Sequence, residues 1–99
     1  MTQVSKYPVS SEVYERIFDV FLQTLASLNT KKNVAEFLEE FLTPTERVTL
    51  AKRFAVAFLL TKGYSYREIS QILRVSVSTI GFVSLDLATG KNFKKVVSE

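Results

Sequence analysis

The chain has 99 residues, a length typical of one domain, and its 46% hydrophobic content with only three Gly and two Pro favours a packed globule over a linker. It has neither Cys nor His, which excludes disulfides and thiol nucleophiles and removes the commonest zinc ligands and the commonest general base. The net charge of +3 is unevenly distributed, because residues 1–49 hold five basic and seven acidic groups (−2) and residues 50–99 hold eight basic and three acidic groups (+5). This split is compatible with a second half that faces a polyanion, and equally with ordinary solvated charge.

Residues 1–42 are predicted to form two amphipathic helices. Ser10 or Ser11 can cap the first, which ends near Asn29, and residues 29–32 form a polar connection. So short a chain buries a modest fraction of its surface, so we expect a second copy to cover part of its apolar residues. The apolar residues of the two helices recur at helical spacing: Val13, Tyr14, Ile17, Phe18, Val20, Phe21, Leu22, Leu25 and Leu28, then Val34, Phe37, Leu38, Phe41 and Leu42.

A central helix is predicted over residues 44–62. Thr43, Pro44 and Glu46 supply a capping hydroxyl, a Pro at the first helical position and the Glu of a capping box. The segment Phe54–Leu60 is apolar on every side, which predicts a helix enclosed by others. Gly63 is placed to end the helix, because glycine adopts the left-handed conformation at little cost.

Two short helices follow within residues 65–88. Ser65 and Glu68 form a second capping box, which opens a helix running to about Leu73. Ser76 can cap another helix over Val77 to about Thr89. The tail, residues 89–99, begins with Gly90 as a stop signal and can add a last turn or two at Asn92–Val97. The predicted fold is all-α, with one domain of five to six helices.

The spacing of the two short helices predicts a helix-turn-helix, because a link of about three residues is too short for antiparallel packing. Arg74 lies where this turn often uses Gly with a positive φ, at a cost of about 1 kcal/mol for any other residue. The alternative is a plain pair of packed helices in a bundle. The residues predicted to line the inner faces are Ile69, Leu73, Val75, Ile80 and Val83, with the small Ser70 where the helices approach most closely.

In a helix-turn-helix, the first residues of the second helix meet base edges in the major groove of DNA. The residues predicted to be free at that end are Ser76, Val77, Ser78, Thr79, Gly81 and Phe82. Three of them, Ser76, Ser78 and Thr79, carry hydroxyl groups. Tyr66 and Arg74 are also predicted to bind DNA.

The segments Leu42–Arg47, Arg67–Ile69 and Ser78–Ile80, together with Arg53 and Gly63, resemble the Trp repressor superfamily over about residues 34–88. The stretch after the second short helix, residues 87–92, is more similar to the shorter YerC/YecD-type members. The resemblance implies an intertwined homodimer in which the first helices interlock, so that residues 1–42 serve dimerisation. It also implies that the helix-turn-helix binds operator DNA. It implies that Arg67 touches DNA, that Ser78 and Thr79 contact bases, and that Lys52 and Arg53, near the exposed start of the third helix, face phosphates.

The resemblance also implies a site for tryptophan, to which this chain matches only in part. Thr43 and Arg53 match the family, whereas Phe82 replaces a second Arg, Val83 replaces the neighbouring Gly, and Asp86 replaces a Ser one turn later. Phe82 cannot hold the carboxylate of the ligand, and Asp86 would repel it. We therefore expect no tryptophan binding, and expect Phe82 to fill the vacant pocket.

The predicted function is a dimeric, sequence-specific transcriptional regulator, a repressor, that binds double-stranded DNA without tryptophan or any cofactor. The alternative is a protein-interaction adaptor on the same fold, since Val77 and Phe82 are unusually apolar for a DNA-binding surface. An enzyme is not expected, because Glu36, Glu39 and Glu40 lie on one solvated helical face with no His, Cys or Gly-rich loop beside them.

A cytoplasmic protein without membrane association is expected. Residues 1–10 contain no apolar stretch that could serve as a signal peptide. The longest apolar run, Phe54–Leu60, is far shorter than the roughly 20 residues that span a bilayer.

Overall fold

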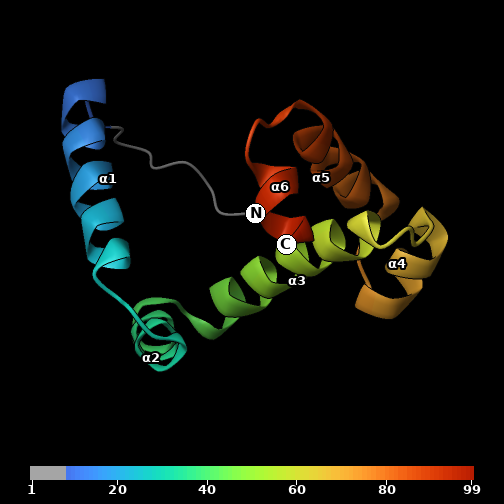
Figure 1. The fold of residues 1–99 in the computed structure, drawn as a ribbon, viewed down its shortest axis with the longest axis horizontal. Coiled ribbons are helices and arrows are strands. Elements are labelled where there is room, and N and C mark those ends of the chain that lie inside the picture. The colour runs from blue at the N-terminus through green and yellow to red at the C-terminus, as the bar shows by residue number, and fades with distance from the viewer. Residues whose placement is uncertain (1–8) are drawn as a thin grey trace. The chain divides into compact units, whose positions relative to one another are not determined.

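A computed structural model describes residues 9–99, in which every regular element is a helix and there is no strand (Figure 1). This confirms the predicted all-α class. The chain divides into two compact units, the first ending at Pro44 and the second spanning Thr45–Glu99. Its organisation as one domain stays a prediction. The helices are α1 (Ser11–Ala26), α2 (Lys31–Phe41), α3 (Pro44–Thr61), α4 (Tyr66–Leu73), α5 (Val77–Thr89) and α6 (Phe93–Ser98).

The two helices of the first unit begin at side-chain caps. The Ser10 hydroxyl accepts a hydrogen bond from the Val13 backbone N–H at 3.3 Å, which decides between the two predicted caps. The Thr30 hydroxyl accepts one from the Asn33 N–H at 3.1 Å, so α2 begins within the stretch that was predicted to be a connection. Helix α1 ends at Ala26, before the predicted Asn29.

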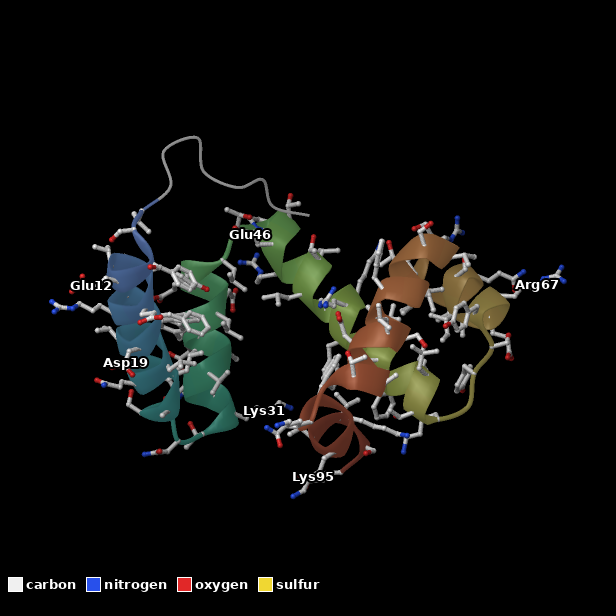
Figure 2. The ribbon with its side chains drawn as sticks, turned by 90° about the horizontal axis from the view of Figure 1, so that it is seen from above. Glu12, Asp19, Lys31, Glu46, Arg67 and Lys95 are labelled. Atoms are coloured by element: carbon white, nitrogen blue, oxygen red, sulfur yellow. The ribbon has the colours of Figure 1, made fainter. Side chains whose placement is uncertain are left out.

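Aromatic contacts join the helices of the first unit without enclosing them. The rings of Phe21 and Phe41 lie 5.7 Å apart between α1 and α2, and Figure 2 shows rings filling the space between these helices. No residue of α1 or α2 is buried, however, and Ile17 in the apolar stripe of α1 is 58% exposed. Residues 9–44 of the first unit therefore form no closed hydrophobic core.

The hydrophobic core of the described chain lies in the second unit. Helix α3 buries only Val56 and Ala57, and Phe54 remains 57% exposed beside them. The prediction that α3 is enclosed on every side is therefore wrong for the single chain, because α4, α5 and α6 cover one face of it. The buried residues that make up this core are Val56, Ala57, Ile69, Ile80, Val83, Leu87 and Val97.

Gly63 ends α3 as predicted. Its φ of +88° is the left-handed conformation that glycine adopts without a Cβ clash. The Tyr64 N–H donates to the Leu59 carbonyl and the Gly63 N–H to the Leu60 carbonyl, both at 3.1 Å. This pattern satisfies the last carbonyl groups of the helix and turns the chain toward α4.

Truncating a buried side chain of this core should cost far more stability than truncating an exposed one in the same helix. Ile69 is fully buried and Ile72 is 57% exposed, and both belong to α4. We expect Ile69→Ala to lower the free energy of unfolding by about 2–5 kcal/mol, and Ile72→Ala by less than ~1 kcal/mol. Urea denaturation followed by circular dichroism measures both, and equal losses would contradict the assigned core.

Candidate nucleic-acid interface

Helix α4 begins at the predicted capping box. The Ser65 hydroxyl accepts from the Glu68 N–H at 3.1 Å, and a Glu68 carboxylate oxygen accepts from the Ser65 N–H at 3.0 Å. These hydrogen bonds lower the pKa of the Glu68 carboxyl from its ordinary value, the bond from the Ser65 backbone first and the bond with the Ser65 side chain second. The start of α4 is therefore held by an ionised side chain at neutral pH.

The turn between α4 and α5 has the geometry of a helix-turn-helix. The two helices are bent by 118° across a three-residue link, within the range of about 90–120° typical of this motif. Arg74 has φ 56° and ψ 48°, so the predicted left-handed residue lies at the predicted place. The Ser70 hydroxyl donates to the Val75 carbonyl at 2.7 Å, which ties α4 directly to the turn.

The start of α5 is a small cluster of hydroxyl groups. Ser76 caps the helix by accepting from the Thr79 N–H at 3.1 Å, as predicted. The Ser76 and Thr79 hydroxyl oxygens also lie 2.9 Å apart, and either of them can be the donor. Ser78 and Thr79 are exposed, so this helix end faces outward and not into the core of the second unit.

The remaining predicted contacts of the motif also lie on its surface. Arg67 and Arg74 are exposed, and Figure 2 shows Arg67 extending away from α4. Val77 is 56% exposed beside Ser78, and Tyr66 is partly exposed in the first turn of α4. The structure thus leaves two cations, an aromatic hydroxyl and an apolar side chain exposed on the helices of the motif.

The two cations predicted on α3 are placed differently from the expectation. Lys52 and Arg53 lie in the middle of α3, not near its start, and Lys52 is half-buried. The Arg53 guanidinium is paired with the Asp86 carboxylate of α5 at 2.5 Å. The charge of Arg53 is therefore balanced within the chain.

This ion pair also corrects the expectation for the tryptophan site. Phe82 was expected to fill the vacant pocket, but its side chain is 68% exposed and points out of the core. It is Asp86 that lies against Arg53, because α5 presents Asp86 on the flank that faces α3. Thr43 belongs to the first unit and Arg53 to the second, and their joint role around a ligand stays a prediction.

Sequence reasoning missed two of these interactions. Ser70 was expected only to be small, and the signal for its hydrogen bond is a hydroxyl residue placed four positions before a left-handed turn. The pairing of Arg53 with Asp86 has no local signal, since 33 residues separate the two and each has other possible partners.

The comparisons with known proteins agree with this geometry. Helices α3 and α6 pack against the bent, capped pair of α4 and α5, which is the arrangement of a helix-turn-helix domain. Residues 16–99 match the family described as Trp repressor protein. The chain belongs to this family. Comparisons with curated proteins and with solved structures find no match.

Within residues 9–99, no single helix has the length and apolar composition needed to cross a membrane. Only α4 and α5 taken together pass that test, as a pair bent by 118°.

The capping box makes a pH-dependent contribution to stability. Because the folded-state pKa of Glu68 is lowered, this contribution is fully present above the unfolded-state pKa and is lost as the pH falls through the folded-state value. We expect Glu68→Gln to be less stable than the wild type at pH 7, and the difference in unfolding free energy to shrink on acidification. Urea unfolding at a series of pH values from 7 to about 3 measures it. A difference that stays constant over this range would contradict the assignment.

Proposed function

We propose that this protein is a dimeric, sequence-specific regulator of transcription, a repressor, that binds double-stranded DNA through its helix-turn-helix. The observation that carries the proposal is the 118° bend between α4 and α5, which exposes the capped, hydroxyl-rich end of α5. Membership of the Trp repressor family supports the same function.

The N-terminal end of α5 is the part proposed to enter the major groove. The Ser78 hydroxyl makes no hydrogen bond within residues 9–99, so it is available to a base edge. The Thr79 hydroxyl is shared with Ser76, and the Val77 side chain can contact a thymine methyl group. Because short hydroxyl side chains discriminate bases less sharply than Arg or Asn, the proposed sequence specificity is modest.

Arg67 and Arg74 are proposed to contact phosphates on either side of that helix end, with Tyr66 beside them. Both arginines are exposed and neither has an ion-pair partner within residues 9–99. Lys52 is proposed as a weaker contact because it is half-buried, and Arg53 supports the interface through Asp86. Phosphate contacts of this kind release counterions, so affinity should fall with salt.

A second copy of the chain is proposed to cover the first unit. Helices α1 and α2 bury no residue, and large apolar side chains in α1 and at the end of α2 remain exposed. A contiguous apolar surface of this kind marks an interface in a stable protein. The intertwined dimer suggested by the family accounts for it.

Binding without tryptophan is proposed from the pair of Arg53 and Asp86. The carboxylate of Asp86 already occupies the guanidinium that the family uses for its ligand. An amino-acid carboxylate would have to displace it, while Phe82 supplies no second cation. A second candidate function, a protein-interaction adaptor, is favoured only by the exposed apolar side chains of Val77 and Phe82.

Charge reversal in the helix-turn-helix tests the proposed DNA binding. We expect Arg67→Glu with Arg74→Glu to weaken binding at least about a hundredfold, since two phosphate contacts become repulsions. The measurement is fluorescence anisotropy with a duplex that the wild-type protein enriches from a random-sequence pool. Wild-type affinity should fall linearly in log–log form with rising salt, and added tryptophan should leave it unchanged.

Lys31→Glu with Lys32→Glu is the matched control, because it reverses two exposed charges at the start of α2, outside the motif (Figure 2 labels Lys31). It should bind DNA as the wild type does. If the variant with Arg67→Glu and Arg74→Glu keeps its dimer and binds DNA as tightly as the wild type, the result would favour the protein-interaction adaptor.

A buried charge at the proposed dimer interface tests the role of α1. We expect Ile17→Asp to raise the dimer dissociation constant at least about tenfold, because association would bury a carboxylate in an apolar contact. Arg16→Asp is the control, since the Arg16 side chain is 81% exposed on the polar face of the same helix. Analytical ultracentrifugation measures the dimer dissociation constant of both variants. An unchanged constant in Ile17→Asp would exclude this face of α1 from the dimer interface.

A further inference from the structure

Gly81 is a residue of α5 whose identity the fold does not account for. It lies within the helix, between the buried residues Ile80 and Val83 in sequence. Glycine in a helix interior destabilises it relative to alanine, because the backbone loses more freedom on folding. A glycine at such a position therefore calls for a reason.

Nothing within the described chain supplies that reason. Gly63 is the only glycine in residues 9–99 with a positive φ, so the backbone at Gly81 suits any residue. A Cβ built on Gly81 meets no heavy atom within 4 Å. Gly90 shows the contrast, since a Cβ there would lie 2.8 Å from the Asp86 carbonyl oxygen. Neither conformation nor internal packing requires glycine at position 81.

The position of Gly81 on the helix suggests a reason for glycine there. It follows Val77 by four residues and Ser78 by three, so it lies directly one turn beyond them on the same side of α5. Those two side chains are exposed at the helix end proposed to contact DNA. Gly81 thus extends that surface by one turn with bare backbone.

We infer that Gly81 lets the backbone of α5 approach the floor of the DNA major groove, and that its missing side chain is a determinant of DNA affinity. An α-helix with its side chains is about 10–12 Å wide and the groove about 12 Å, so one added methyl group at the contact pushes the helix outward. Ser78 would then lose its reach to the base edges. The inference rests on the proposed DNA binding and adds a residue to it.

Stability and DNA affinity should therefore move in opposite directions in Gly81→Ala. We expect the Tm to rise by about 2–8 °C, because alanine favours the helix. We expect the Kd for the wild-type-enriched duplex to rise at least about fivefold, with a larger loss for Gly81→Leu. Differential scanning calorimetry and fluorescence anisotropy measure the two quantities on the full chain.

Ala88→Gly is the matched control. It lies on the same side of α5 two turns further on, and is exposed near the far end of the helix. It removes the methyl group that the test variant adds, so its Tm should fall while its Kd, measured well below the Tm, should stay at the wild-type value.

The other outcomes overturn the inference in distinguishable ways. If Gly81→Ala binds as tightly as the wild type while the charge-reversed Arg67 and Arg74 variant does not, only the role of Gly81 fails and the proposed function stands. If its Tm falls, internal packing requires the glycine. If ultracentrifugation shows that the dimer weakens instead, Gly81 serves contact between copies. If the wild type enriches no duplex, the inference fails together with the proposed function.

Discussion

The burial of Ile69 and Ile80 against Val56 and Ala57 is the contact on which the second unit depends. All four side chains are completely inaccessible, and they come from three different helices. Only three residues join α4 to α5, so the two helices can bring these side chains to α3 together only if they cross steeply. Close packing inside and an outward-facing helix end are thus two results of one constraint, because the crossing that buries Ile80 exposes Ser78.

Features that depend on neighbours in the sequence were predicted well. The capping box of Ser65 and Glu68, the cap at Ser76, the stop at Gly63 and the left-handed Arg74 are all decided within four residues, and all lie where the sequence placed them. Such signals depend on backbone groups that every helix end must satisfy, so tertiary context changes them little. The predicted helix-turn-helix follows from these signals and from the short link.

Features that depend on distant parts of the chain were not predictable in the same way. Asp86 was expected to repel a ligand, and its ion pair with Arg53 was not predicted. That pair depends on the distance between α3 and α5, which the sequence does not give. Phe82 was expected to fill the ligand pocket because it replaces the second Arg of the family's tryptophan site. The orientation of α5 exposes its side chain to solvent instead. The exposed face of α3 likewise reflects which helices of one chain cover it. Large apolar side chains also remain exposed on α1 and α2, although their spacing predicted an apolar face for each helix.

The left-handed conformation of Arg74 sets two demands against each other at a single residue. Glycine would relax the backbone at this elbow, since φ 56° is strained for every side chain with a Cβ. It would also remove a cation from the exposed corner between α4 and α5. Arginine at this position therefore combines a less stable bend with an exposed positive charge. Selection for thermal stability alone would therefore favour glycine at position 74.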